Sequence, residues 1–227
     1  TFSSSVLESA KVVSVRPDSA WVAEVSGWFV SDLSGVSELV KQAVGEGGAP
    51  GAASLDPGRS HLEAIESFPD NTNVQARLTF RPGEAVSWPS VPDGRYLPLS
   101  IHYTLARLPE EPMEPRLGDD RVGYFWTAHK DFSDTDSTFF VRMSRRWRLE
   151  RGERVGDLWR PVEPITYYIG PSVPSEYRAS MKAGVEAWND AFEAAGWKDA
   201  IRAEDLPEGA DPDDIRYATL RWNLSDQ

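Results

Sequence analysis

The sequence predicts an α+β protein with a β-rich region first and a strand–helix–strand unit after it. Residues 1–160 hold mainly short β-branched and aromatic runs separated by Pro, Gly and Asp turns. Residues 161–227 hold one long amphipathic segment between two strand-like runs. We therefore predict a domain boundary between residues 160 and 161. The first domain is expected to be a β-sandwich or a strongly bent antiparallel sheet.

The elements of the first domain follow from periodicity and turn signals. Apolar residues at helical spacing predict a helix over residues 35–44, and the Gly-, Ala- and Pro-rich residues 45–58 predict a loop. Residues 69–72 (PDNT) predict a hairpin between two strands. The expected strands are residues 11–15, 20–30, 61–68, 73–80, 97–105, 122–128 and 138–149. Residues 109–120, rich in proline and acids, predict an extended surface segment.

The second domain begins with a stiff linker, PVEP, at residues 161–164. A compact strand is expected at residues 165–169 and a long helix from Pro174 to Gly196, where glycine suits the end of a helix. A second strand is expected at residues 215–222. One apolar stripe runs along the helix through Tyr177, Met181, Val185, Trp188 and Phe192. We expect Trp188 in the core and its neighbour Asn189 at the surface.

Charge and composition exclude several functions. The chain has 36 acidic and 24 basic residues and a net charge of −12, which opposes binding to nucleic acids and anionic lipids. The basic run at residues 142–154 is interpreted as a solvated strand face. Cysteine is absent, so disulfides, thiol nucleophiles and thiolate metal sites are excluded. No apolar run approaches the roughly 20 residues that a membrane span requires.

No complete catalytic motif is present. The three histidines, His61, His102 and His129, have no second histidine three or four residues away, so no helix presents a paired imidazole site. GxGxxG, Walker and GxSxG patterns are also missing. Alternating acids at Asp131, Asp134 and Asp136 lack the Gly and distal Glu of a calcium loop and are interpreted as a solvated turn.

Several segments are similar to one family. The stretch PITYYIGPSVPSEYRASMKAGVEAWNDAFEAAGWKDAI, followed by DPDDIRYATLRW, resembles the start of the catalytic domain in large bacterial zinc-dependent metalloproteases of the metzincin type. Upstream, SVLES, FPDNTNVQARLTF and DDRVGYFWTAHKDFS resemble the N-terminal domain of unknown function in that group. The resemblance implies that residues 161–227 are the N-terminal βαβ part of a protease domain, and that the protein is periplasmic or secreted.

The zinc-binding motif that the resemblance implies for the family is absent from this chain. The family's HExxHxxGxxH lies on a later helix, where three imidazoles hold Zn²⁺ and the Glu deprotonates the bound water. This chain has no HExxH, so no catalytic and no metal-binding residue is assigned, and the chain alone is predicted inactive. Zinc is expected in the full-length protein. The expected partners are the C-terminal remainder carrying HExxH and a peptide or protein substrate.

Three alternatives stay open for the role of this piece. The first is that the chain is a truncated or processed scaffold of the protease. Within this hypothesis, the first domain is a candidate prodomain that keeps the protease latent by placing an Asp carboxylate on the zinc ion. The candidates for this latency role are Asp119, Asp120 and Asp131. The second reading is a non-catalytic module that binds peptide or glycan through exposed aromatic rings. A hydrolase using paired carboxylates ranks last.

Overall fold

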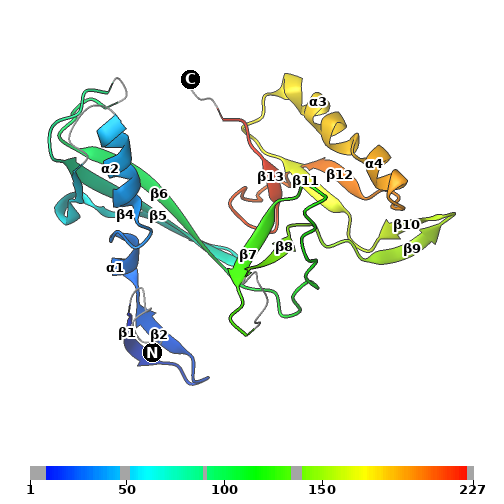
Figure 1. Cartoon of the computed structure of the whole chain (residues 1–227), viewed down its shortest axis with the longest axis horizontal. Coiled ribbons are helices and arrows are strands. Elements are labelled where there is room, and N and C mark those ends of the chain that lie inside the picture. The colour runs from blue at the N-terminus through cyan, green and yellow to red at the C-terminus, as the bar shows by residue number, and fades with distance from the viewer. Residues whose placement is uncertain (1–8, 47–51, 89–90, 134–139, 224–227) are drawn as a thin grey trace. The chain divides into compact units, whose positions relative to one another are not determined.

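The computed structural model describes residues 9–46, 52–88, 91–133 and 140–223. The chain divides into two compact units, Thr1–Ala106 and Arg107–Gln227. Strands predominate and helices are few, so the predicted β-rich α+β class is confirmed (Figure 1). The predicted domain boundary at residues 160 and 161 falls inside the second unit, at the end of a strand, and stays a prediction. No helix among the described residues is long and apolar enough to cross a membrane.

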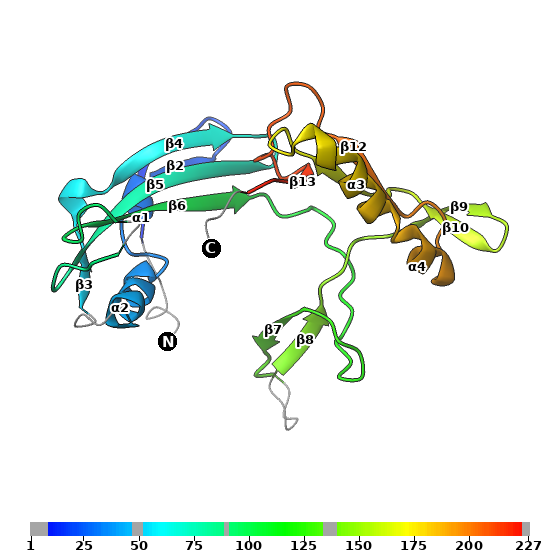
Figure 2. The same cartoon turned by 90° about the horizontal axis from the view of Figure 1, so that it is seen from above.

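The first unit is built around one long strand. β5 pairs antiparallel with β6 from Asn71 to Phe80, and its other side pairs with β4 and then with β3 (Figure 2). The unit contains β1 (Lys11–Val15), β2 (Trp21–Glu24), α1 (Ser26–Phe29), α2 (Val36–Glu46), β3 (Ala53–Leu55), the 3₁₀ turn η2 (Pro57–Arg59), β4 (His61–Ser67), β5 (Asn71–Pro82) and β6 (Leu97–Ala106). β1 and β2 form a separate hairpin. The first unit therefore contains an antiparallel sheet, and its strong bending or a sandwich arrangement stays a prediction.

The core of the first unit lies between α2 and this sheet. Leu78 and Phe80 of β5 and Val44 of α2 are fully buried, as the alternating strand pattern and the helical spacing predict. Burying a side chain of this size contributes about 1.5–3 kcal/mol. The hairpin between β4 and β5 also forms as predicted, closed by a hydrogen bond from the Phe68 N–H to the Asn71 carbonyl at 2.7 Å.

Two predictions in the first unit are wrong in detail. Residues 20–30 are not one strand, because the Glu24 carboxylate accepts a hydrogen bond from the Ser26 N–H at 2.8 Å and α1 begins there. The loop at residues 45–58 contains β3, which pairs with the end of β5 between Ala53 and Pro82. The extended conformation of such a three-residue strand depends on pairing with its partner strand, and the segment is too short to show a periodic sequence pattern.

The second unit contains two hairpins and one parallel sheet. Its elements are β7 (Trp126–Lys130), β8 (Phe140–Ser144), β9 (Arg151–Val155), β10 (Leu158–Pro161), β11 (Ile165–Ile169), α3 (Ser175–Glu186), α4 (Asn189–Ala194), β12 (Ile201–Asp205) and β13 (Ala218–Leu220). β7 pairs with β8 and β9 with β10, both antiparallel. β11 lies between β12 and β13 and is parallel to both. The helices α3 and α4 connect β11 to β12 (Figure 1).

The strand–helix–strand unit is present, but its second strand is not the expected one. The strand that follows the helices is β12, whereas the predicted strand at residues 215–222 is reduced to β13 on the opposite side of β11. β12 (IRAED) escaped prediction because three of its five residues are charged. The strand predicted at residues 138–149 is confirmed only as β8, within the described part of the chain.

The predicted long helix is interrupted. α3 ends at Glu186 and α4 begins at Asn189, with Ala187 and Trp188 in a turn between them. Gly196 follows α4 with a φ of +92°, in the left-handed region that favours glycine, as predicted. Asn189, the first residue of α4, contacts β12 through its side chain.

Candidate functional site

The candidate latency residues have local partners. Asp119 accepts hydrogen bonds from Arg121 Nε at 2.9 Å and Nη2 at 2.5 Å, and this contact with Arg121 lowers the pKa of the Asp119 carboxyl. Asp131 accepts from the Ser133 hydroxyl at 2.6 Å and the Ser133 N–H at 2.9 Å, and these bonds lower the pKa of Asp131. Asp120 is exposed. Both bonded acids act here as turn caps, and the latency role stays a prediction.

The described residues do not form a metal centre. No group of three or more His, Asp or Glu side chains in the described ranges is arranged to hold a metal ion. Asp134 and Asp136 of the calcium-loop pattern lie outside the described residues. The described side chains therefore do not by themselves provide the three ligands that a hydrolytic zinc ion takes from the protein.

The main feature of the second unit is an open apolar hollow of about 520 Å³ between the helices and the parallel sheet. The apolar stripe of the helices forms one wall, and side chains of the sheet form the other. The lining residues are Trp147, Ile165, Tyr167, Met181, Gly184, Val185, Trp188, Phe192, Ile201 and Leu220. Neither α3 nor α4 contains a buried residue. The predicted stripe is present, and within the described residues of the second unit it lines an open hollow instead of a closed core.

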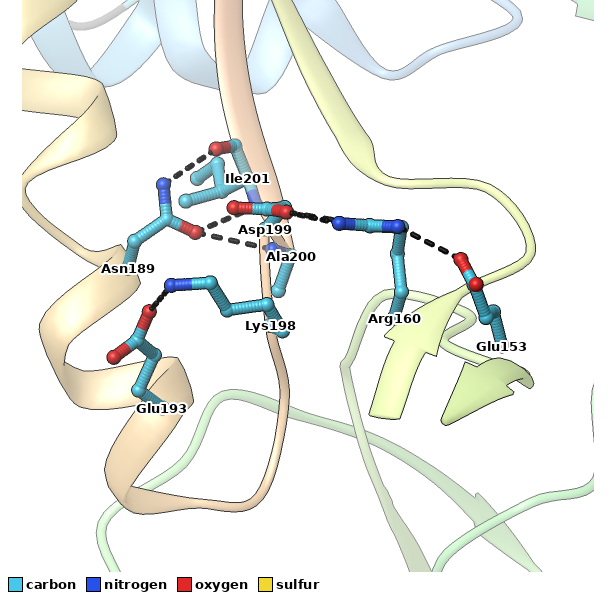
Figure 3. A network of polar contacts seen from close by, with 8 residues as sticks. All are labelled: Glu153, Arg160, Asn189, Glu193, Lys198, Asp199, Ala200 and Ile201. Carbon is cyan, nitrogen blue, oxygen red and sulfur yellow. Dashed lines mark hydrogen bonds and ion pairs between the residues drawn. The ribbon is translucent and has the colours of Figure 1, made fainter. Parts of the chain in front are cut away.

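Trp188 and Asn189 have the opposite environments to those expected. The Trp188 side chain is 63% exposed at the hollow. Asn189 is half-buried and holds β12 with both ends of its amide: Nδ2 donates to the Ile201 carbonyl at 2.8 Å, and Oδ1 accepts from the Ala200 and Ile201 N–H groups at 3.0 and 3.2 Å (Figure 3). The helical stripe predicted Trp188 in the core, but among the described residues of the second unit Trp188 lies at an open hollow, while Asn189 is the side chain that contacts the sheet.

Ion pairs connect the start of β12 to its neighbours. Arg160 of β10 donates to Asp199 at 3.0 Å and to Glu153 of β9 at 2.8 Å (Figure 3). Lys198 pairs with Glu193 of α4, and this hydrogen bond raises the pKa of Lys198. These side chains are exposed or half-buried, so solvent screens each pair and its contribution to stability is small. The β9–β10 hairpin, which the sequence did not predict, is held beside the α4–β12 connection by main-chain hydrogen bonds: the Trp159 N–H donates to the Gly196 carbonyl and the Lys198 N–H to the Trp159 carbonyl, both at 2.9 Å.

Charged side chains lie on the other face of the parallel sheet. A smaller hollow of about 380 Å³ there includes Arg148, Arg202 and Arg216. Asp214 is 3% exposed, and Arg216 Nε and Nη2 donate to it at 3.0 and 2.5 Å, which lowers the pKa of the Asp214 carboxyl. Each arginine also has a carboxylate within 4 Å, so the hollow has no excess of positive charge for an anion.

The residues that carried the RYATLRW resemblance stabilise this sheet. Tyr217 packs edge-on against Tyr168 of β11 with ring centroids 5.1 Å apart. Trp222 stacks on Tyr177 of α3 at 4.9 Å with the two rings nearly parallel. Such aromatic pairs contribute about 0.5–1.5 kcal/mol beyond their buried area. The sequence singled out Tyr217 and Trp222 through the resemblance, but only the structure identifies the rings that they contact.

Aromatic rings are exposed on and beside the β7–β8 hairpin. Tyr124, Phe125 and Trp126 are consecutive and are 56%, 85% and 40% exposed. Phe132 and Phe140 are also exposed. Arg142 lies over the Trp126 ring at 5.5 Å and Lys130 over the Phe140 ring at 5.4 Å, so one face of the hairpin combines aromatic and cationic groups.

Comparison with known proteins identifies the N-terminal two-thirds of the chain. The family model for a domain of unknown function, DUF5117, matches residues 1–151. The match covers the first unit and the β7–β8 hairpin and ends where β9 begins. No curated protein and no solved structure matches the chain. Because the match covers more than half of its residues, the chain belongs to the DUF5117 family.

Proposed function

We propose that this chain is the N-terminal part of a zinc-dependent metallopeptidase, in which it provides an accessory domain and the first βαβ elements of the peptidase domain. Peptide-bond hydrolysis belongs to the full-length protein. The role of this chain is that of a scaffold, and it is not catalytic alone. The resemblance in residues 164–222 suggests the class, and the uncovered hollow supports it.

The single observation that carries the proposal is the apolar hollow beside α3 and α4. A globular domain buries the apolar stripe of each helix against another layer. Here the stripe and the facing sheet leave about 520 Å³ open, lined almost entirely by apolar side chains. Exposed apolar patches of this kind mark interaction sites, and covering them stabilises the complex by about 25 cal/mol per Å². A further polypeptide layer fits this surface.

The partner proposed for this surface is the remainder of the same peptidase, carrying HExxHxxGxxH. That remainder supplies the zinc ligands, because a hydrolytic zinc ion takes three protein ligands and keeps an open fourth position, and the three histidines of the motif provide them. Among the described residues of this chain, no group of three or more His, Asp or Glu side chains is arranged to hold a metal ion by itself. The contribution of this chain is to hold β11, α3 and α4 in position beneath the added layer.

The test is to compare this chain with a longer one encoded by the same reading frame. We expect the longer protein to contain HExxH, to bind one zinc ion by elemental analysis and to hydrolyse a peptide substrate, while residues 1–227 do neither. In the longer protein the Trp188 ring should be shielded from an aqueous quencher. A 25.3 kDa species that is found alone in its native source, monodisperse and cooperative on melting, would refute the proposal.

The prodomain role is tested in the same longer protein. Asp119, Asp120 and Asp131 are each replaced by Ala, and peptidase activity is measured before and after removal of the N-terminal domain. A latency residue is one whose replacement raises the activity of the uncleaved form. Because Asp119 and Asp131 already have partners in their own turns, unchanged activity in all three variants would eliminate this role.

A second candidate function is supported by the exposed rings on and beside the β7–β8 hairpin. A non-catalytic module that binds peptide or glycan uses such rings as a contact surface. We expect Phe125→Ala with Trp126→Ala to abolish retention on a peptide or glycan array that the unmodified chain binds. Arrays on which the unmodified chain retains nothing would eliminate this candidate without affecting the first.

A further inference from the structure

β12 forms one edge of the parallel sheet in the described part of the chain. The main-chain groups of a strand point alternately to its two sides. Ala200 accepts from Ile165 of β11 at 2.8 Å, and the Leu206 N–H donates to the Ile169 carbonyl at 3.2 Å. The N–H and carbonyl groups of the odd-numbered residues of β12 therefore point away from β11, toward the outer edge.

Side chains from the helices occupy this outer edge. Asn189 Nδ2 donates to the Ile201 carbonyl at 2.8 Å, and Asn189 Oδ1 accepts from the Ile201 N–H at 3.2 Å (Figure 3). Glu186 accepts from the Ala203 N–H at 3.3 Å. An unpaired edge is a template for another strand, and natural proteins cover such edges. Here two polar side chains at the α3–α4 junction cover it.

The sequence of β12, IRAED, is complementary to itself in the antiparallel direction. With Ala203 opposite Ala203 of a second copy, Arg202 stands opposite Glu204 in both halves of the pair. Opposite charges at directly facing positions stabilise a strand pair, whereas like charges destabilise it. The groups that would form the bonds of this pair belong to the outward-pointing residues Ile201, Ala203 and Asp205, so the register of opposite charges matches the hydrogen-bonding register. Ile201 then stands opposite Asp205, whose carboxylate is paired with Arg178 and Lys182 of α3 in this structure.

We propose that the outer edge of β12 is a self-pairing surface for a second copy of this chain, and that Asn189 and Glu186 hold it closed. Pairing requires the α3–α4 junction to withdraw, because a second strand needs about 4.8 Å of lateral space. The Asn189 and Glu186 contacts oppose this withdrawal. The closed state is monomeric at this edge, and loss of the two side chains opens it.

The test is the oligomeric state of Glu186→Ala/Asn189→Ala in the full chain, by light scattering across a concentration series. We expect dimers at concentrations at least tenfold below those at which the unmodified chain associates. Adding Arg202→Glu should return the variant to monomers, because Glu then faces Glu. Adding Arg202→Glu with Glu204→Arg should restore the dimer, because the charges are again opposite. A folded double variant that remains monomeric overturns the proposal, as does a dimer indifferent to these charges.

Two measurements keep the test decisive if the double variant does not fold. Glu186→Ala alone frees the central Ala203 N–H, leaves Asn189 in place, and should dimerise more weakly but with the same dependence on Arg202. Hydrogen exchange on the unmodified chain should show protected amides at Ile201 and Ala203. Rapid exchange at both amides, or a monomeric Glu186→Ala variant, overturns the proposal.

Discussion

The effect of replacing Gly184 on stability distinguishes an open hollow from a closed core. Gly184 lies inside α3 and lines the hollow, and a Cβ placed on it meets no atom within 4 Å. Alanine in a helix interior is more stable than glycine by about 0.5–1 kcal/mol, since it lowers the entropy of the unfolded chain. Gly184→Ala should therefore raise the melting temperature of this chain by roughly 1–4 °C.

Calorimetry measures this shift, and Gly170→Ala is the matched control. A Cβ on Gly170 would lie 2.9 Å from the Leu220 carbonyl oxygen, which already accepts the Gly170 N–H at 2.9 Å. That variant should lose about 1–3 kcal/mol through overpacking. A Gly184→Ala variant less stable than the unmodified chain would show that the hollow is filled and that the reasoning is wrong.

A larger side chain at Gly184 should affect the stability of this chain and the assembly of the full-length protein differently. Gly184→Leu places a larger apolar side chain, from a strong helix former, in the hollow, so this chain alone should be at least as stable as Gly184→Ala. In the proposed full-length peptidase the same leucine would compete with the covering layer. We expect peptidase activity to fall while the isolated chain remains folded. Full activity in Gly184→Leu would show that no layer covers this surface.

Three further perturbations have defined outcomes. Asn189→Ala removes three hydrogen bonds to β12 and should cost about 2–3 kcal/mol in a urea titration, whereas Asn223→Ala, on an exposed residue, should cost nothing measurable. The lowered pKa of Asp214 means that its carboxylate stabilises the fold above the unfolded value of about 3.9, and that this stability is lost as pH falls through the folded pKa. Asp214→Asn should therefore differ most from the unmodified chain above about pH 4 in urea titrations at several pH values, and a constant difference down to pH 2 would refute this. Phe80→Ala should cost about 3–5 kcal/mol and lower only the calorimetric transition of the first unit; a shift of both transitions would contradict separate folding.

Much of the architecture could be predicted from local patterns. β1, β11, α2 and the β4–β5 hairpin follow directly from β-branched runs, helical spacing and a turn-forming tetrapeptide. The absence of HExxH, of cysteine and of a phosphate-binding loop is likewise a property of the sequence. These features depend on neighbours within about ten residues, so the chain specifies them before any long-range contact forms.

Other features depend on contacts distant in the sequence. β3 is a strand because β5 pairs with it, and the charged β12 is a strand because β11 lies on one side and Asn189 on the other. The helical stripe predicted correctly which side chains share a face, but not that this face is open, and so it placed Trp188 in the core and Asn189 outside. Periodicity reports the direction of a side chain relative to its own helix. Only the tertiary structure decides what lies opposite, because burial is a property of two surfaces and the sequence pattern describes one.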